Sequence, residues 1–325
     1  MSKKIGVIGL GSIGLRHAKN LANLGHQVIA WDPDRAKCDE AMRYRGSGSN
    51  SIPIGTVDCI HDATHGDEDG VVIASPTNLH IEHLSRVLRE HTAPVFVEKP
   101  IAHSDRVFHL EDLIKSRPMM VGYNLRFHSC VKKAKEWLDA GLIGEPIWAN
   151  FTCAQYNDKP AYLRDGVIFN WSHEIDLALY LLGPAKVAAS STRIDRPGTA
   201  NSDVNCYGVG DSMADILLTH DSGTRSAIHL DYDSNPEHRG FTIVGTRTSM
   251  TANLLTGVMT VKRNYGDELP DLTICLDNNW SDNYIEEMQA FLDRIDGKQT
   301  LGADGKDGLA VLDICLEVRK AAGLT

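Results

Sequence analysis

Residues 4–14 read KIGVIGLGSIG, and this stretch decides the fold of the first part of the chain. Residues 4–8 form a short apolar run, and the pattern Gly9-x-Gly11-x-x-Gly14 follows before a segment with helical spacing of apolar side chains. A strand, a glycine loop and a helix in this order are the context in which the pattern binds a dinucleotide. Gly9 allows the tight turn, Gly11 lets the backbone approach a pyrophosphate, and Gly14 lets the helix lie close to the sheet.

The residues around this loop indicate which dinucleotide binds. Ser12 and Ile13 open the expected helix, where free N–H groups and the helix dipole favour the negative charge of a pyrophosphate. Asp32 ends the second apolar run, where a carboxylate can bind both ribose hydroxyls. Because a carboxylate repels a 2′-phosphate, the sequence favours NAD over NADP. Arg35 lies nearby and could meet such a phosphate, so NADP stays as the less favoured alternative.

Apolar runs and helical patterns alternate through residues 1–121. Each expected strand is a continuous apolar run, as in a parallel sheet covered by helices on both faces. We therefore expect a Rossmann-type doubly wound α/β domain over residues 1–121. The expected strands are 4–8, 27–31, 70–74, 93–97 and 119–123, and the expected helices are 13–24, 35–44, 78–91 and 105–116.

The sequence pattern changes in residues 122–325, where short strand-like runs are separated by turn residues. The turn Asp221-Ser222-Gly223 predicts a hairpin, and the succession of runs predicts a meander. We expect a second α+β domain with a mostly antiparallel open sheet, packed against the first with a cleft between them. Its expected helices are 130–142, 167–182, 283–296 and 307–322, and its expected strands are 147–155, 187–194, 213–220, 224–231, 241–245, 248–254 and 258–263.

Length, charge and cysteine usage narrow the class of protein. The 325 residues suit two domains, and the net charge of −10 without a Lys/Arg run argues against nucleic acid or an anionic membrane as partner. The sequence contains no run of 18 apolar residues, so we expect no membrane-spanning helix. The seven cysteines are an odd number and form no C-x-x-C pair, which favours a reducing, cytoplasmic compartment with cysteines used as small buried apolar residues.

Three further segments carry a family resemblance. Residues 72–80 read VIASPTNLH, residues 97–100 read VEKP, and residues 171–176 read WSHEID. With the glycine loop, they resemble the Gfo/Idh/MocA family of NAD(P)-dependent oxidoreductases over essentially the whole chain. The resemblance implies an enzyme that transfers a hydride between a nicotinamide and a substrate. It implies cofactor contacts at Ser75, Pro76, Thr77, Asn78, His80, Glu98 and Lys99.

Some of these positions have a purely structural alternative. Pro76 could only shape the turn, with Thr77, Asn78 and His80 capping the next helix, and Glu98 could be a structural residue. Two histidine pairs, His61 with His65 and His80 with His83, have spacings that suit a metal. Because no third ligand with suitable spacing follows either pair, we expect no metal site.

The resemblance also implies the catalytic residues. The lysine of the Glu-Lys-Pro motif is Lys99, and the family's helix histidine matches His173. Many members carry an aspartate three or four positions before that histidine, where this chain has Asn170 and Phe169. Because an amide cannot take a proton as a carboxylate can, proton transfer is expected to fall to His173 and Lys99, with Asn170 as an orienting group.

Alcohol oxidation requires a base within hydrogen-bond reach of the hydroxyl. The unperturbed pKa of a histidine such as His173 suits proton transfer near neutrality. Lys99 acts as a base if neutral or stabilises a developing alkoxide if charged. Asp176 lies one helical turn beyond His173 and either orients the imidazole or is a capping or surface residue. His173 itself could instead be a core histidine, and Asn170 a residue of the helix face.

Substrate contacts are expected from the second domain together with Lys99 and His173. Arg126 and Arg164 can each donate a planar fork to a carboxylate or phosphate, or can form ordinary ion pairs. Asn124 and Gln155 suit sugar hydroxyls. The expected substrate residues beyond the catalytic pair are Tyr123, Asn124, Arg126, Gln155, Tyr162 and Arg164.

The sequence thus predicts an NAD-dependent oxidoreductase acting between nicotinamide and a secondary hydroxyl or ketone of a sugar, polyol or sugar acid. One alternative is a nucleotide-sugar 3-dehydrogenase of the UDP-N-acetylhexosamine type, in surface-polysaccharide synthesis. Others are a non-catalytic NAD-binding regulator and a reductase of an imine or biliverdin-like ligand. The family commonly associates through the antiparallel sheet, so we expect a homodimer or homotetramer.

Overall fold

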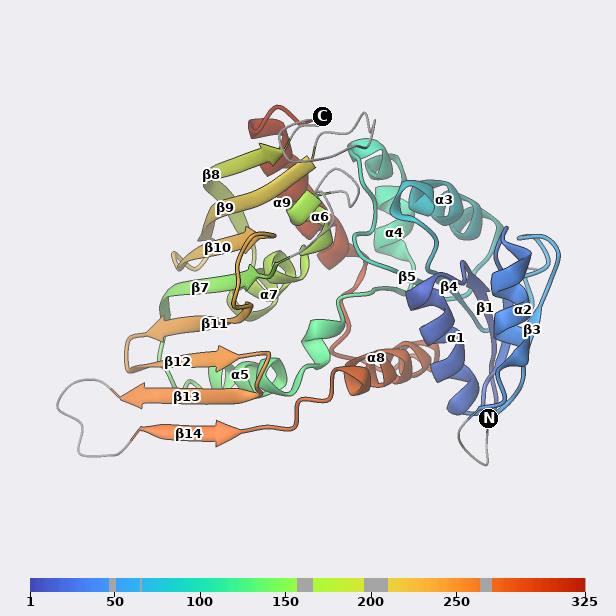
Figure 1. Ribbon diagram of the computed structural model, residues 1–325, viewed down its shortest axis with the longest axis horizontal. Helices are drawn as coiled ribbons and strands as arrows, with labels where there is room; N and C mark the ends of the chain where they lie inside the picture. The colour runs from blue at the N-terminus through green and yellow to red at the C-terminus, as the bar shows by residue number, and fades with distance from the viewer. Residues whose placement is uncertain (47–50, 65, 157–165, 196–209, 264–270, 325) are drawn as a thin grey trace. The chain divides into compact units, whose positions relative to one another are not determined.

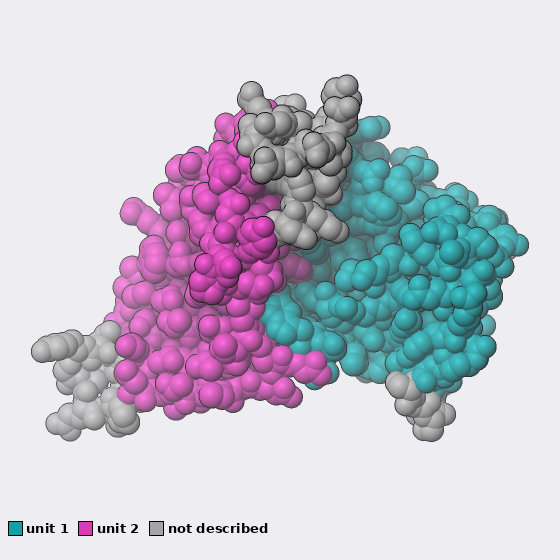
Figure 2. Space-filling model, viewed as in Figure 1, with its two compact units in different colours: residues 1–127, 280–309 teal, residues 128–279, 310–325 magenta. Residues whose placement is uncertain are grey.

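The computed structural model describes residues 1–46, 51–64, 66–156, 166–195, 210–263 and 271–324. The chain divides into two compact units, coloured separately in Figure 2. Unit 1 comprises residues 1–127 and 280–309, and unit 2 comprises residues 128–279 and 310–325. The domain boundary expected from the sequence lies after residue 121. Residues 122–127 and 280–309 group with the first unit instead of the second.

Unit 1 is built on a six-stranded parallel sheet in the order β3-β2-β1-β4-β5-β6 (Figure 1). The chain starts in the middle with β1, moves outward to one edge and then returns to build the other half. This order is that of a doubly wound sheet, in which right-handed crossovers place helices on both faces. The strands are β1 (Lys4–Ile8), β2 (Gln27–Trp31), β3 (Ile54–Thr56), β4 (Gly70–Ile73), β5 (Val95–Val97) and β6 (Met119–Val121).

The helices of unit 1 follow the expected alternation with one addition. Helix α8, far along the chain, packs beside α1, and its Met288 and Phe291 lie in the same apolar core as Ala18 and Leu21 of α1. The helices are α1 (Ser12–Asn23), α2 (Arg35–Arg43), α3 (His80–Glu90), α4 (Glu111–Ser116) and α8 (Trp280–Ile295), with 3-10 turns η1 (Thr77–Leu79), η2 (Asp105–Leu110) and η3 (Asn124–Phe127).

Unit 2 is built on an eight-stranded sheet in the order β14-β13-β12-β11-β7-β10-β9-β8 (Figure 1). Most neighbours are antiparallel, and the predicted Asp221-Ser222-Gly223 turn joins β9 to β10. The meander is interrupted, because β7 lies between β10 and β11 and pairs with β10 in parallel. The strands are β7 (Pro146–Ala154), β8 (Ala185–Asp195), β9 (Gly210–His220), β10 (Arg225–Asp231), β11 (His238–Gly245), β12 (Thr248–Asn253), β13 (Val258–Arg263) and β14 (Leu272–Cys275).

The helices of unit 2 are α5 (Ser129–Asp139), α6 (Gly166–Asn170), α7 (His173–Leu182) and most of α9 (Gly305–Ala321). The single helix predicted over 167–182 is two helices, because the chain turns at Trp171 and Ser172 before α7 begins. Helix α7 ends at Gly183, whose φ of +89° favours glycine. Among the described residues, no helix is long and apolar enough to cross a bilayer.

Candidate active site

The glycine loop between β1 and α1 has the geometry that a dinucleotide requires. Gly9 has φ +94°, and a Cβ there would lie 2.7 Å from the carbonyl oxygen of Ala74. A Cβ on Gly14 would lie 2.0 Å from the carbonyl oxygen of Gly9, so only glycine lets α1 approach the loop this closely. A Cβ on Gly11, in contrast, meets nothing within 4 Å. Open space therefore lies where the backbone would approach a pyrophosphate.

The N-terminus of α1 is suited to an anion. Gly11 is the N-cap, no side chain caps the helix, and the first turn has no acidic residue. Ser12 is exposed and Ile13 partly buried at this end of the helix. The N–H groups and the helix dipole at such an end stabilise a phosphate. These residues fit the pyrophosphate of a dinucleotide.

Asp32 lies at the end of β2 and is mostly buried. One carboxylate oxygen accepts a hydrogen bond from the backbone N–H of Leu10 (2.7 Å), and the other accepts one from Asp34 (2.9 Å). These bonds join the end of β2 to the glycine loop. An ionised carboxylate has about four acceptor positions, so it keeps capacity for ribose hydroxyls.

A cavity of about 580 Å³ adjoins the glycine loop and extends between α1 and α2. Lys19 and Lys37 line it. Both ammonium groups already face carboxylates, since Lys37 Nζ lies 3.6 Å from Asp32 and Lys19 Nζ lies 4.0 Å from Glu40. Arg35, the residue that kept NADP open, pairs with Asp58 at 2.7 Å. Lys19, Lys37 and Arg35 thus each face a carboxylate.

The segment after β4 separates into structural residues and accessible ones. The His80 ring lies between two backbone carbonyls, with Nδ1 2.9 Å from Pro100 O and Nε2 2.9 Å from Ser75 O. Burial lowers the pKa of His80 below its ordinary value, although the two hydrogen bonds oppose this effect. Nδ1 of His83 lies 2.8 Å from the Ser75 hydroxyl. Ser75 and His80 therefore join the β4 loop to the segment after Lys99.

The three residues after Ser75 are accessible to solvent. Pro76 and Asn78 are exposed, and Thr77 is partly exposed. No side-chain capping hydrogen bond forms at the start of η1 or α3. The capping alternative for Thr77 and Asn78 thus has no hydrogen bond to support it, and these side chains stay candidates for cofactor contact.

The Glu-Lys-Pro motif directly follows β5. Glu98 Oε1 lies 2.7 Å from Nε2 of His17 on α1, and Glu98 Oε2 accepts a hydrogen bond of 3.1 Å from the backbone N–H of Lys99. A Cβ on Gly122, the residue after β6, would lie 2.9–3.0 Å from the Glu98 carboxylate, so glycine at this position leaves room for that carboxylate where it lies. Glu98 is therefore held inside unit 1, and Lys99 is partly exposed beside it.

The segment of unit 2 that carries the predicted catalytic residues Asn170 and His173 spans the break between α6 and α7. Asn170 Nδ2 donates to the Tyr232 hydroxyl (2.9 Å), which in turn donates to the carbonyl of Gly166 (3.2 Å). His173 is the first residue of α7 and is partly exposed, which does not match a fully buried core histidine. Asp176 is completely buried, so it is not a surface residue.

The remaining substrate candidates differ in their surroundings. Tyr123 and Asn124 are buried. Arg126 is buried and pairs with Asp307 at 2.9 Å within unit 1, which matches the ion-pair alternative for this residue. Gln155 is partly exposed at the end of β7. Tyr162 and Arg164 lie outside the described residues.

Two residues of unit 1 that the sequence analysis did not single out join Glu98. His17 and Glu287 are both completely buried. One ring nitrogen of His17 and one carboxyl oxygen each of Glu98 and Glu287 all lie within 4.8 Å of one another. In the part of the chain that the structure describes, this is the one such gathering of histidine, cysteine or carboxylate groups. The available signal was His17, a titratable residue at an apolar-face position of the first helix. Of the histidine pairs considered earlier, His80 and His83 are in no such group among the described residues, and the pair of His61 with His65 cannot be followed because His65 lies outside them.

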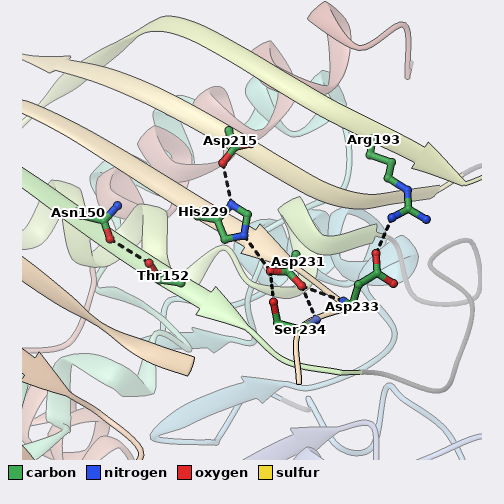
Figure 3. Close-up of polar contacts among 8 residues, drawn as sticks. All are labelled: Asn150, Thr152, Arg193, Asp215, His229, Asp231, Asp233 and Ser234. Carbon is green, nitrogen blue, oxygen red and sulfur yellow. Dashed lines mark hydrogen bonds and ion pairs between the residues drawn. The ribbon is translucent and has the colours of Figure 1, made fainter. Parts of the chain in front are cut away.

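A second polar cluster lies on the eight-stranded sheet of unit 2 (Figure 3). His229 on β10 lies between Asp215 (2.7 Å) and Asp231 (2.8 Å). Burial lowers the pKa of His229, but its hydrogen bonds to the two carboxylates outweigh burial and raise it overall. Asp231 also accepts hydrogen bonds from the backbone of Asp233 and Ser234. This cluster stabilises the end of β10, and no sequence motif pointed to it.

Comparison with known proteins agrees with this geometry. The family model of the oxidoreductase family with an NAD-binding Rossmann fold matches residues 3–125, and that of the GFO/IDH/MocA C-terminal domain matches residues 131–251. Among curated relatives, an inositol 2-dehydrogenase of Rhizobium meliloti is 28% identical, covering 96% of this chain and 94% of that protein. A scyllo-inositol 2-dehydrogenase (NAD(+)) of Bacillus subtilis is 27% identical, covering 92% and 88%.

Solved structures share the whole fold. A levoglucosan dehydrogenase in complex with NADH matches with a TM-score of 0.81 at 18% identity, covering 99% of this chain and 98% of that chain. UDP-N-acetylglucosamine 3-dehydrogenase GnnA from Acidithiobacillus ferrooxidans matches with a TM-score of 0.78 at 21% identity over the full length of both chains. With both family models matched in order, the chain belongs to the Gfo/Idh/MocA family of oxidoreductases, and it is a dehydrogenase that acts on CH–OH groups.

Proposed function

We propose that this protein is an NAD-dependent dehydrogenase of a polyol or sugar that oxidises a secondary ring hydroxyl to a ketone. The observation that carries this proposal is the position of Lys99. It follows β5 at the carboxyl edge of the sheet, the edge that also carries the glycine loop and Asp32. In a doubly wound sheet, ligands bind outside the carboxyl ends of the strands. The curated relatives named as inositol dehydrogenases support a cyclic polyol as the substrate class.

The preference for NAD over NADP rests on charge. Asp32 presents a carboxylate where a 2′-phosphate would lie, and the neighbouring Lys37 and Arg35 already face carboxylates. Because like charges repel, a phosphorylated ribose beside the Asp32 carboxylate is disfavoured. Cofactor contacts are assigned to Gly9, Gly11, Ser12, Ile13, Gly14, Asp32, Pro76, Thr77, Asn78 and Lys99, with Ser75, His80 and Glu98 supporting them through the hydrogen bonds described above.

The bound nicotinamide supplies the hydride acceptor for oxidation and the hydride donor for reduction. Oxidation leaves the hydroxyl proton to be taken by a side chain of the protein. We assign this proton to His173, whose ordinary pKa suits transfer near neutrality. Lys99 stabilises the negative charge that develops on the oxygen, and Asn170, held by Tyr232, orients the hydroxyl. Gln155, partly exposed after β7, is a further candidate for substrate contact, whereas Tyr123 and Asn124 are buried and the ion pair of Arg126 with Asp307 favours a structural role for that residue.

The test is NADH formation with a panel of myo-inositol, scyllo-inositol, glucose, a sugar acid and a UDP-N-acetylhexosamine. We expect the highest kcat/KM with a cyclic polyol or free sugar, and a higher kcat/KM for NAD than for NADP. If the nucleotide sugar gives the highest kcat/KM, the substrate class is a nucleotide sugar and not a polyol or free sugar. Tight NADH binding without turnover of any substrate would support a regulator instead.

We also propose that the protein is a homodimer or homotetramer that associates through the outer face of the eight-stranded sheet. Trp148 on β7 and Leu217 on β9 are large apolar residues with 42% and 49% of their surface exposed. Both point to the same face, because Trp148 pairs across Arg225 and Leu217 pairs across Ala227 of β10. Light scattering after size exclusion tests this, and substituting both residues by aspartate is expected to give monomers.

A further inference from the structure

Glu287 on α8 is a buried carboxyl group that the proposed chemistry does not use. It is completely buried, and neither of its oxygens has a hydrogen-bond partner among the residues that the structure describes. Its carboxyl nevertheless lies within 4.8 Å of the His17 imidazole and the Glu98 carboxylate. Buried polar groups are normally paired, so this side chain requires an explanation.

The neighbouring groups determine which charge state Glu287 can hold. Glu98 already uses its two oxygens for His17 (2.7 Å) and the Lys99 backbone (3.1 Å). Tyr284 lies on the same helix, and the guanidinium of Arg16 stacks on the Tyr284 ring at 4.5 Å. A second carboxylate beside Glu98 would be desolvated and repelled, and both effects favour the neutral acid. Burial first, and then the charge of Glu98, raise the pKa of Glu287 well above its ordinary value.

A bound cation would be another way to balance two carboxyl groups, but the spacing argues against it. Two donors on one tetrahedral zinc ion with bonds of about 2.1 Å lie about 3.4 Å apart. His17 Nε2 and Glu98 Oε1 are 2.7 Å apart, which is the length of a charge-assisted hydrogen bond. The spacing therefore matches a hydrogen bond between the two side chains rather than two ligands of one zinc ion.

We propose that Glu287 is a positioning residue that, as a neutral carboxylic acid, supports the His17–Glu98 pair and through it fixes the backbone that carries Lys99. Glu287 on α8 lies within 4.8 Å of the Glu98 carboxylate, and Glu98 accepts the hydrogen bond from the Lys99 N–H, with Gly122 leaving space for this carboxylate. Because Lys99 lies directly after this anchor, displacement of Glu98 moves the ammonium group away from the reacting oxygen. The expected effect of Glu287 on turnover rests on the role proposed for Lys99. The neutral state of Glu287 and its position beside Glu98 do not depend on that role.

Three variants separate these claims. Glu287→Gln has the shape and charge of the neutral acid, Glu287→Ala removes the group, and Glu286→Gln changes the exposed neighbour on the same helix as the matched control. Infrared spectroscopy of the full-length protein at neutral pH is expected to show the C=O stretch of a protonated carboxyl group. That band should be absent from Glu287→Gln and retained in Glu286→Gln. An unchanged spectrum in Glu287→Gln would overturn the neutral-acid assignment, as would a divalent cation that copurifies with the wild type and is lost from Glu287→Gln.

Two further readouts test positioning. In amide NMR spectra, the Lys99 resonance should move in Glu287→Ala and stay near its wild-type position in Glu287→Gln. For turnover, Glu287→Ala should lose at least about tenfold in kcat with KM for NAD changed less than about twofold, and Glu287→Gln should restore kcat. A lowered Tm in Glu287→Ala with an unmoved Lys99 resonance would refute positioning and leave a structural role only. Absence of turnover in the wild type would refute the proposed function, while the infrared and NMR results would still decide the present proposal.

Discussion

Gly11→Ala tests the glycine loop most cleanly, because it separates cofactor binding from folding. A Cβ on Gly11 meets nothing within 4 Å, and the backbone angles, φ −62° and ψ −175°, are open to any residue. The substitution gains about 0.4–1 kcal/mol by restricting the unfolded chain. It loses about 0.5–1 kcal/mol because alanine is a poorer N-cap than glycine. The two effects nearly cancel, so Tm should stay within about 2 °C of the wild type.

Binding should respond differently. The added methyl group projects into the open space where a pyrophosphate would contact the backbone of the loop. We expect the dissociation constant for NADH to rise at least about tenfold, which corresponds to about 1.4 kcal/mol. Isothermal titration calorimetry measures this loss, and differential scanning calorimetry measures Tm in the same preparation.

Gly14→Ala is the matched contrast within the loop. Its Cβ would lie 2.0 Å from the Gly9 carbonyl oxygen, so it should destabilise the fold by about 1–3 kcal/mol. A Gly11→Ala protein that binds NADH as tightly as the wild type, with an unchanged Tm, would refute the assignment of this loop to the pyrophosphate.

The other predictions concern chemistry, packing and pH. Lys99→Ala should lower kcat at least about 100-fold with little change in NADH affinity, whereas the exposed Lys115→Ala should leave both unchanged; steady-state kinetics and calorimetry compare them. Glu174→Ala removes the buried carboxylate that Arg239 contacts at 2.7 Å, and urea unfolding should show a loss of about 3 kcal/mol, against less than about 1 kcal/mol for the exposed Glu136→Ala. Several buried histidines have lowered pKa values because burial disfavours their charged form, so below their ordinary value of 6.5 the unfolded chain binds more protons than the folded one. Stability should therefore fall as pH drops below about 6.5, and Tm that stays constant between pH 7 and pH 5 would contradict this reasoning. The buried histidines are His80, His83, His128 and His220, and the pKa of the partly buried His26 is lowered in the same way.

The parallel sheet of unit 1 was predictable because its signals are local. Each strand is a continuous apolar run, and the spacing of Gly9, Gly11 and Gly14 reflects steric needs that the structure confirms at Gly9 and Gly14. The short edge strand Ile54–Thr56 was missed because only one of its three residues is buried. One helix was predicted over 167–182, where the structure has two. Trp171 and Ser172 are buried like the helical residues around them, so the sequence pattern gave no sign that α6 ends before them.

Long-range pairing was less accessible from sequence. Strand β7 inserts between β10 and β11, and no local pattern specifies which distant strand a run pairs with. For the same reason, the return of residues 280–309 to unit 1 was not predicted, although their helix was. Glu287 lies near Glu98 because α8 packs on α1. The two residues are nearly 190 positions apart in the sequence, so no local motif predicts that they meet.

Hydride transfer itself is the most direct test of the central claim. The measurement uses a substrate found in the polyol and sugar panel, carrying deuterium on the carbon that bears the reacting hydroxyl, and mass spectrometry of the reduced cofactor. We expect the deuterium to appear on the nicotinamide ring in the wild type and its transfer to be nearly lost in Lys99→Ala. Reduced cofactor without deuterium, or equal transfer in the two proteins, would contradict hydride transfer assisted by Lys99.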